Sequence, residues 1–473
     1  MRSLVLSLAA LALAAPAAAQ DRSDPHRRML AAGYKAAFLC SGLFNAGQSE
    51  ATVERDELKG TYPELEPIFP ELKASVDREK LTVSVPFAPD LPPRVAIWRP
   101  HIGCTQLPVG ADPDMQIFRM GGSALDYARL DARPWPMGDR GGTARFSGNA
   151  RRLGQAIERA FDRRSYGQGS ETTAVLVLQD GRIVAERYRA DFDRHTSQRT
   201  WSVAKSMAAT LIGVAVQDKL LDVHRPLGVD APYQPDGEVR AAIPDWAWRD
   251  PRGQLTVDHL LRMSSGLSSP HAGNRTDDVY FGGVAFSDTV GSLPLVAKPG
   301  SRFRYANNDT LLAVSALQYA LTADRIQSID FPSKRLFRRI GMTRTVAETD
   351  WHGTFILSSQ VWTTARDLAR LGLLYLNGGT WAGERVIPAD WFDYVRRHGP
   401  AQPASGYGYG AGFWTFPKGS GLPEDAAVMR GNRGQYVVIA PSQKLIVVRR
   451  GYDGPQNGFD LDAFTRDVLA ALA

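Results

Sequence analysis

Two β-hairpin patterns lie at opposite ends of the last two-thirds of this chain, and they limit the folds open to it. In the first, Ala174–Leu178 and Arg182–Tyr188 are joined by Gln179-Asp180-Gly181, and Asp-Gly between alternating strands is a strong hairpin signal. In the second, Gln435–Ala440 and Leu445–Arg449 are joined by a Pro-Ser turn. We therefore expect one antiparallel sheet whose strands come from both ends of this segment.

The residues between the hairpins are mostly helical in pattern. The clearest helices are expected at residues 207–216, 259–263 and 365–376, with others before the first hairpin (147–161) and after the second (459–472). The sequence thus predicts an α+β fold, in which an antiparallel sheet flanked by helices carries an inserted all-helical lobe.

The first third of the chain differs from the rest in its sequence pattern. The chain has 473 residues, a length that suits two or three domains. Residues 20–145 begin with a helical pattern at Arg28–Leu43. Segments interrupted by proline follow, with short strand patterns at 81–85 and 94–98. The stretch Pro134–Arg145 resembles a linker. We expect residues 20–145 to be an N-terminal extension or a small accessory domain, followed by a main domain at residues 146–473.

The first 19 residues have the pattern of a signal peptide. Arg2 supplies the charged start, Leu4–Ala15 the apolar core, and Ala17-Ala18-Ala19 a small-residue cleavage site before Gln20. The apolar run is too short to span a membrane, and no later segment is apolar enough to do so. We expect a soluble periplasmic or secreted protein with no stable membrane insertion.

Charge and cysteine content narrow the classes of partner. The net charge is +6, but the basic residues are scattered and form no stripe, which argues against nucleic acid binding. The two cysteines, Cys40 and Cys104, are expected to form a disulfide in an oxidising compartment, with two separate buried thiols as the alternative. No C-x-x-C or histidine cluster accompanies them, so no zinc site is predicted.

Ser202 and Lys205 form the most suggestive chemical pattern, an S-x-x-K at the start of a predicted helix. A lysine three residues after a serine lies beside it on the same helix face, and burial lowers a lysine pKa toward the range of a general base. A neutral amine can then take the hydroxyl proton and activate the nucleophile. The alternative is an N-capping serine beside a solvent-facing lysine.

Two later motifs could complete a site. In Tyr305-Ala306-Asn307, the phenol could relay a proton to a leaving group and the amide could hold the lysine and orient a substrate carbonyl. In Arg430–Gln435, the N–H of Gln435 could join that of Ser202 as an oxyanion donor. The alternatives are a common Y-x-N tripeptide in a loop and a plain glycine turn into the hairpin.

In this order, the motifs resemble those of the serine β-lactamase and penicillin-recognising superfamily. The class C-like branch, with family VIII carboxylesterases and 6-aminohexanoate-oligomer hydrolases, is the most similar. The resemblance rests on Ser202-Val203-Ala204-Lys205, Tyr305-Ala306-Asn307, the T-V-x-H-L-L-x-x-x-S-G-L-like stretch Thr256–Leu267 and the helix Thr364–Gly372. It covers residues from about 150 to the end and implies a β-lactamase/transpeptidase-like fold.

The third motif departs from that family's pattern. Where β-lactamases and penicillin-binding proteins usually have Lys-Thr-Gly, this chain is aligned at Asn432-Arg433-Gly434. The family's lysine attracts a substrate carboxylate, so its loss makes β-lactam hydrolysis less expected, although Arg430 or Arg433 could compensate. His259 is expected to pack the lobe rather than act in catalysis, and the aromatic run Tyr407–Trp414 either lines an acyl pocket or packs a strand.

Together these observations predict an exported serine hydrolase that cleaves ester or linear amide bonds through an acyl-enzyme. The catalytic residues would be Ser202, Lys205 and Tyr305, with Asn307, Asn432 and Gly434 binding the substrate. No metal or organic cofactor is implied. The alternatives are a β-lactamase or D-amino-acid peptidase and, in another class, a non-catalytic penicillin-recognising sensor. The partner would be a small ester or amide, and a homodimer remains open.

Overall fold

The computed structural model describes residues 24–114, 125–228, 250–269, 276–290, 292–323, 328–404 and 406–472. A central antiparallel sheet of seven strands runs in the order β12-β13-β14-β15-β16-β5-β6. The strands are β5 (Thr172–Gln179), β6 (Arg182–Tyr188), β12 (Gly408–Tyr409), β13 (Trp414–Thr415), β14 (Ala427–Gly431), β15 (Gln435–Ala440) and β16 (Leu445–Gly451). The predicted signal peptide, residues 1–19, lies outside the described residues.

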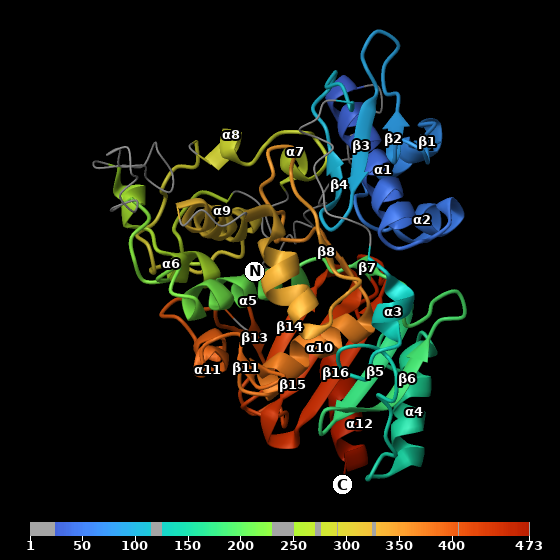
Figure 1. Cartoon of the computed structure of the whole chain (residues 1–473), viewed down its shortest axis with the longest axis vertical. Coiled ribbons are helices and arrows are strands. Elements are labelled where there is room, and N and C mark those ends of the chain that lie inside the picture. Colours follow the sequence, from blue (N-terminus) through green and yellow to red (C-terminus); the bar gives the residue numbers. More distant parts are fainter. Residues whose placement is uncertain are drawn as a thin grey trace, which may run out of the picture.

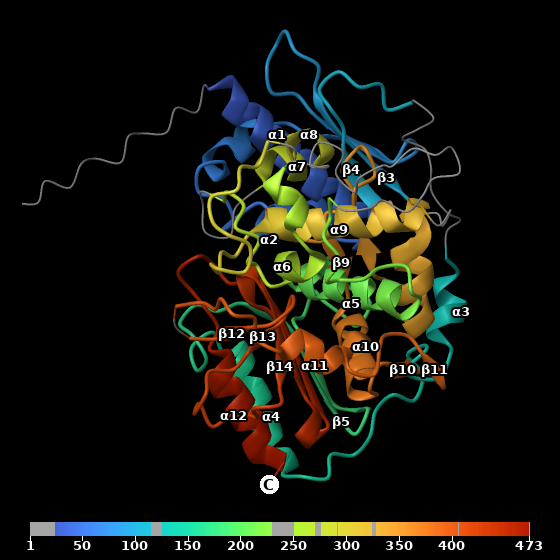
Figure 2. The same ribbon diagram turned by 90° about the vertical axis from the view of Figure 1, so that its left-hand side faces the viewer.

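The pairing of β5 with β16 joins the two predicted hairpins into one sheet, as the sequence predicted. Val447 of β16 faces Val177 of β5, and both strands are buried along almost their whole length. One face of the sheet packs against α4 (Ala150–Phe161) and α12 (Leu461–Leu472), and the other against α10 (Ala365–Leu376). Figure 2 shows α4 and α12 side by side below the helical lobe.

The inserted lobe lies between β6 and β12 in the chain and covers one end of the sheet (Figure 1). Its helices are α5 (Val203–Gln217), α6 (Val257–Leu261), α7 (Asp277–Tyr280), α8 (Ser287–Val290) and α9 (Asn307–Ala323); α11 (Trp391–Arg396) follows α10. Small strands accompany them: β7 (Gln198–Arg199), β9 (Val361–Thr363) and β8 (Val346–Ala347) form one sheet, and β10 (Thr380–Trp381) and β11 (Glu384–Arg385) form another. The lobe is therefore mainly, but not entirely, helical.

The N-terminal unit has its own small sheet. Strands β1 (Ser75–Asp77), β2 (Thr82–Val85), β3 (Arg94–Arg99) and β4 (Gly103–Gln106) pack against α1 (Pro25–Phe44), while α2 (Glu50–Asp56) follows α1 and α3 (Tyr127–Asp131) comes later. The predicted disulfide is confirmed, and Cys40 on α1 is bonded to Cys104 on β4. Within the described residues, no helix combines the length and apolarity needed to cross a membrane.

Buried polar contacts fix the N-terminal unit to the rest of the molecule. The Glu348 carboxylate accepts hydrogen bonds from Ser41 Oγ (2.6 Å), Asn45 Nδ2 (2.8 Å) and the Cys104 N–H (3.1 Å). Burial raises the pKa of this carboxyl to about 7. The first third of the chain is thus docked on the lobe. We propose that the boundary between the N-terminal unit and the main domain lies near residue 145.

The stretch predicted as a linker packs over α10. Arg370 donates to the carbonyls of Pro136 and Gly138, and both Arg366 and Arg370 pair with the Asp139 carboxylate. Because two arginines of α10 are almost fully buried here, they need a nearby anion and carbonyls, and this stretch supplies them. It is a fixed strap rather than a free connection.

Candidate active site

Ser202 sits at the N-cap of α5, where the chain leaves β7. Its side chain makes no capping hydrogen bond, so the hydroxyl is available to other groups. The preceding residue, Trp201, has a φ of +51°, a left-handed conformation that is unfavourable for a bulky side chain. This bend presents Ser202 at the positive end of the α5 dipole.

Lys205 lies one turn into α5, buried beneath Ser202. Its Nζ is 3.1 Å from Ser202 Oγ, 2.7 Å from Asn307 Oδ1 and 2.8 Å from the Ser358 carbonyl oxygen. Burial, helped by the positive charge of Arg199, lowers the pKa of this amine to about 7. Within the described part of the chain no carboxylate forms an ion pair with Lys205, so a neutral amine is accessible near neutral pH.

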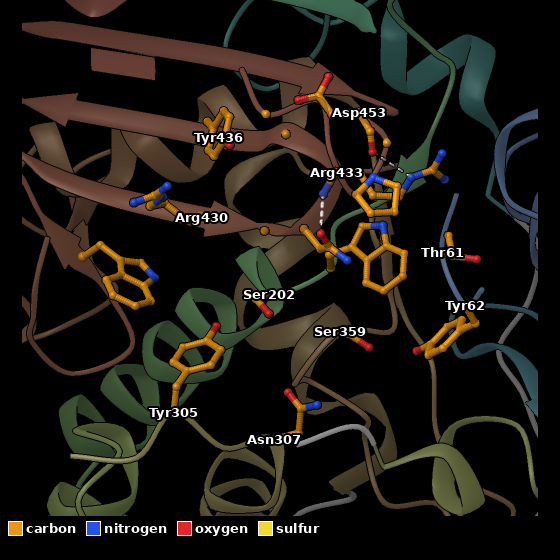
Figure 3. A pocket seen from close by; sticks show the side chains of 18 of the residues that line it. Thr61, Tyr62, Ser202, Tyr305, Asn307, Ser359, Arg430, Arg433, Tyr436 and Asp453 are labelled. Carbon is orange, nitrogen blue, oxygen red and sulfur yellow. Dashed lines mark hydrogen bonds between the residues drawn. The ribbon is translucent and has the colours of Figure 1, made fainter. Parts of the chain in front are cut away.

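Tyr305 and Asn307 come from the loop before α9 and the first residue of that helix. The Tyr305 hydroxyl is directed toward Ser202 (Figure 3), and burial raises the pKa of the phenol above its usual value, so it stays protonated. Lys205 Nζ lies 5.0 Å from the centre of its ring. Asn307 opens a helix of 17 residues that fixes its position, whereas the alternative interpretation placed the tripeptide in a plain loop.

The glycine that lies against Ser202 is Gly431 rather than Gly434, the glycine matched to the third motif in the sequence. A β-carbon on Gly431 would come within 3.2 Å of Ser202 N and 2.3 Å of the Thr200 carbonyl oxygen, so only glycine lets β14 approach the nucleophile. Gly434 instead lies against Arg449 and Asp453. The triplet beside the nucleophile is therefore Met429-Arg430-Gly431, again without the family's lysine.

Gln435 does not occupy the position expected of an oxyanion donor. It is absent from the residues that line the cavity around Ser202, and it is 1% exposed. Its side chain accepts from Arg450 Nε and donates to the carbonyls of Gly451 and Arg433. Asn432 and Gly434, predicted to bind substrate, do line the cavity, as does Asn307.

Arg430 and Arg433, the two arginines near Gly431, differ in the groups that they contact. Arg433 is buried and donates to the backbone carbonyls of Asp56, Tyr452 and Asp453. Both arginines line the cavity, but the Arg430 guanidinium lies over the rings of Tyr407 (3.9 Å), Tyr436 (5.7 Å) and Trp414 (5.9 Å).

These groups share a cavity of about 620 Å³, in the size range of small-molecule sites. Figure 3 shows Ser202 between Tyr305 and Arg430 on one side and Thr61 and Tyr62 on the other. The lining residues are Thr61, Tyr62, Trp201, Ser202, Tyr280, Tyr305, Asn307, Ser359, Trp414, Arg430, Gly431, Asn432, Arg433, Gly434, Tyr436, Asp453, Gly454, Pro455 and Gly458.

His259 and most of the aromatic run are not part of this lining. His259 lies at the middle of the five-residue helix α6, as predicted, and its ring nitrogen accepts from the Thr256 N–H in a capping box. Of the run Tyr407–Trp414, Trp414 reaches the cavity, while Tyr409 packs edge-on against the Tyr305 ring. The run supports the side of the site that carries Tyr305.

One cluster among the described residues has metal-ligand geometry and does not line the cavity around Ser202. Asp131, Asp139 and His195 place their ligand atoms within 4.8 Å of one another. However, Arg344 pairs with Asp131, and Arg366 and Arg370 pair with Asp139. Since these cations already neutralise the carboxylates, the cluster is better explained as an ion-pair network.

Three further contributors could not be inferred from the sequence. Arg199 is 1% exposed and stacks on Trp201 (3.7 Å) and Phe38 (4.4 Å), close enough for its charge to influence Lys205. Thr61 and Tyr62 reach the cavity from the N-terminal unit. Thr61 and Tyr62 lie in no recognisable motif, because only tertiary packing brings them to Ser202.

Comparisons with known proteins agree with this architecture. The β-lactamase family model matches residues 157–470, about two-thirds of the chain. A 6-aminohexanoate-dimer hydrolase from Paenarthrobacter ureafaciens is 26% identical over 321 residues, which cover 62% of this chain and 77% of that protein.

Two solved structures share the fold at low sequence identity. A penicillin-binding protein homologue from Caulobacter crescentus superposes with a TM-score of 0.53 at 16% identity, covering 70% of this chain and 99% of that one. A family VIII carboxylesterase gives a TM-score of 0.52 at 16% identity, covering 70% and 98%. The resemblance in the motifs is confirmed: the chain belongs to the β-lactamase family and is a serine hydrolase built on that fold.

Proposed function

We propose that this protein cleaves ester or linear amide bonds of small substrates, with Ser202 as nucleophile and Lys205 as its general base. The observation that carries the proposal is the set of partners around Lys205 Nζ. Asn307 Oδ1 and the Ser358 carbonyl can each accept one N–H of a neutral amine. The remaining lone pair is then directed at the Ser202 hydroxyl, 3.1 Å away.

In this mechanism, Lys205 accepts the Ser202 proton as Oγ attacks the substrate carbonyl carbon and forms a tetrahedral intermediate. Tyr305, a protonated phenol, donates its proton to the leaving group as the carbonyl–heteroatom bond breaks, and the proton on Lys205 restores the phenol. Water then attacks the acyl-enzyme carbonyl and loses a proton to the same pair. As the bond between Ser202 Oγ and the acyl carbon breaks, the pair returns this proton to Ser202 Oγ and the acid product leaves.

For the oxyanion, we assign one donor to the N–H of Ser202 and the second to the N–H of Asn432, in place of Gln435. Neither of these N–H groups donates to another described group, and Gly431 brings the end of β14 against Ser202 N. Two backbone donors aimed at the same point would stabilise the charge that develops on the carbonyl oxygen.

The direct test replaces Ser202 with alanine. The wild-type protein should hydrolyse p-nitrophenyl butyrate and be labelled by a fluorophosphonate, and Ser202→Ala should lose both properties. Turnover retained by the variant would refute the assignment of the nucleophile. Acylation of the wild type by penicillin without any turnover would favour the non-catalytic sensor.

A β-lactamase or D-amino-acid peptidase activity remains the second candidate, supported by Arg430. Within the described residues this guanidinium forms no ion pair, and it faces the cavity on the Tyr305 side. It could receive a carboxylate on the leaving-group side of the substrate. Comparing kcat/KM for nitrocefin and p-nitrophenyl butyrate separates the two candidates, and faster turnover of nitrocefin would favour the second.

We also propose that the protein is exported. Its support is the predicted cleavage site before Gln20 together with the disulfide, since such bonds persist in oxidising compartments. Mass spectrometry of the mature protein from the periplasm or medium should find an N-terminus at Gln20. An intact N-terminus in the cytoplasmic fraction would contradict this.

A further inference from the structure

The N-terminal unit, which the family match does not cover, supplies part of the cavity around Ser202. Thr61 and Tyr62 lie on the turn after α2 and line the cavity. Tyr62 is 3% exposed, and its ring packs edge-on against Tyr34 (5.2 Å) and Phe281 (5.5 Å). This aromatic packing gives the turn a fixed place, with Phe281 contributed by the lobe.

Hydrogen bonds from the catalytic domain hold the start of the same turn. Arg433 donates to the Asp56 carbonyl, and the Tyr452 hydroxyl donates to Glu57 Oε1 at 2.9 Å. Within the N-terminal unit, the Tyr34 hydroxyl lies 3.0 Å from the Glu57 carbonyl and 3.2 Å from Thr61 Oγ1. These contacts are buried or partly buried, so the turn is a permanent part of the cavity wall and not a lid.

The turn that carries Thr61 and Tyr62 lies on one side of Ser202 only. In Figure 3, Tyr305 and Arg430 lie to one side of Ser202, and Thr61 and Tyr62 lie to the other. In the mechanism proposed above, Tyr305 protonates the leaving group, so the leaving group occupies the first side. The acyl part of the substrate must then extend toward Thr61 and Tyr62.

We propose that Thr61 and Tyr62 form the end wall of the acyl pocket, so that the N-terminal unit sets the length of the acyl chain accepted. The inference rests on the proposed function and adds to it a substrate class, esters or amides of short acyl chains. Thr61 is only partly buried and belongs to no catalytic contact, so its size can be changed without touching Ser202, Lys205 or Tyr305.

The experiment measures kcat/KM for p-nitrophenyl acetate, butyrate, hexanoate and octanoate. Their common leaving group keeps the Tyr305 side of the site constant, so differences report the acyl side. In the wild type, kcat/KM should fall steeply beyond a short chain. Each methylene that a pocket admits or refuses changes kcat/KM by about 10- to 200-fold.

Two variants of Thr61 should move this profile in opposite directions. Thr61→Ala should shift the fall to longer chains and raise the octanoate-to-acetate ratio of kcat/KM at least about tenfold, while Thr61→Phe should lower that ratio by a similar factor. Lys59→Ala is the matched control, because Lys59 is exposed on the same turn and does not line the cavity; its profile should equal that of the wild type.

The outcomes separate this inference from the proposed function. If folded Thr61→Ala and Thr61→Phe proteins, checked by thermal unfolding, keep the wild-type profile or lose activity equally for all four esters, the acyl-wall inference is wrong. If Ser202→Ala retains turnover, the nucleophile itself is wrong, whatever the chain-length profile shows.

Discussion

Buried cations occur at two places in this molecule, and the two places differ in whether an anion pairs with the cation. Under the strap, Arg366 and Arg370 meet the carboxylate of Asp139, whose pKa these arginines hold at about 2. At the nucleophile, Lys205 meets an amide oxygen, a carbonyl and a hydroxyl, and its pKa falls to about 7. A buried cation with an anionic partner stabilises structure, whereas one without can exchange a proton near neutral pH.

The largest expected effect comes from removing the unpaired cation. Lys205→Met should lower kcat/KM for p-nitrophenyl butyrate by about 10²- to 10⁴-fold, because Ser202 loses its general base. The free energy of unfolding should not decrease, since methionine of similar length removes a buried charge that no described anion compensates. Urea unfolding measures stability, and Lys59→Met is the exposed control. A large loss of stability would mean that Lys205 is structural.

The approach of β14 to the nucleophile can be tested at Gly431. Gly431→Ala should lower kcat by about 10²- to 10³-fold, the cost of losing one oxyanion donor. The added methyl would meet the Thr200 carbonyl oxygen at 2.3 Å and push the strand away from Ser202. Gly154→Ala on α4, where a β-carbon meets nothing within 4 Å, should leave kcat unchanged. Equal activity in both variants would remove β14 from the oxyanion site.

The opposite result is expected when the paired cluster is broken. Arg370→Met should lower the free energy of unfolding by about 3–5 kcal/mol, because Asp139 and Asp367 lose a buried partner. Activity of the remaining folded protein should stay near that of the wild type. Lys444→Met, which breaks an exposed pair with Asp180, should show no measurable change in stability. A loss of kcat in folded Arg370→Met would contradict the division between the clusters.

The smallest effect is a pH dependence that only one cluster should show between pH 5 and 9. Protonated Lys205 cannot accept a proton, so kcat/KM should rise about tenfold per pH unit below pH 7 and level off above it. The Asp139 pKa is lowered from 3.8 to about 2, so its contribution to stability is present above pH 4 and is lost as pH falls toward 2. A flat pH–rate profile would argue against a lysine base.

The sequence predicted most of the sheet and the nucleophile region because those features are local. Hairpin turns, helix periodicity and the spacing of Ser202 and Lys205 each involve a few neighbouring residues, and the disulfide followed from composition and the predicted leader. Tyr305 and Asn307 were recognised through the resemblance rather than through a physical signal of their own.

The remaining parts of the site depend on contacts between distant segments. The proposed change of the second oxyanion donor from Gln435 to Asn432 could not be inferred from the sequence. Gly431 and Gly434 both fit a glycine motif, and only the packing of β14 on Ser202 distinguishes them. Likewise, Thr61 carries no mark of function in the sequence, because Arg433 and Tyr452 bring its turn to the cavity from almost 400 residues later.

The pairing of β5 with β16 also affects how a newly made chain acquires activity. Ser202 and Lys205 leave the ribosome more than 200 residues before Gly431, and the central sheet lacks its middle strands until β15 and β16 have been made. Contacts so remote in sequence form late and slowly. Under the proposed mechanism, a ribosome-bound chain that ends before β14 therefore holds Ser202 without its oxyanion site, and hydrolysis begins only after β14 has been made and paired.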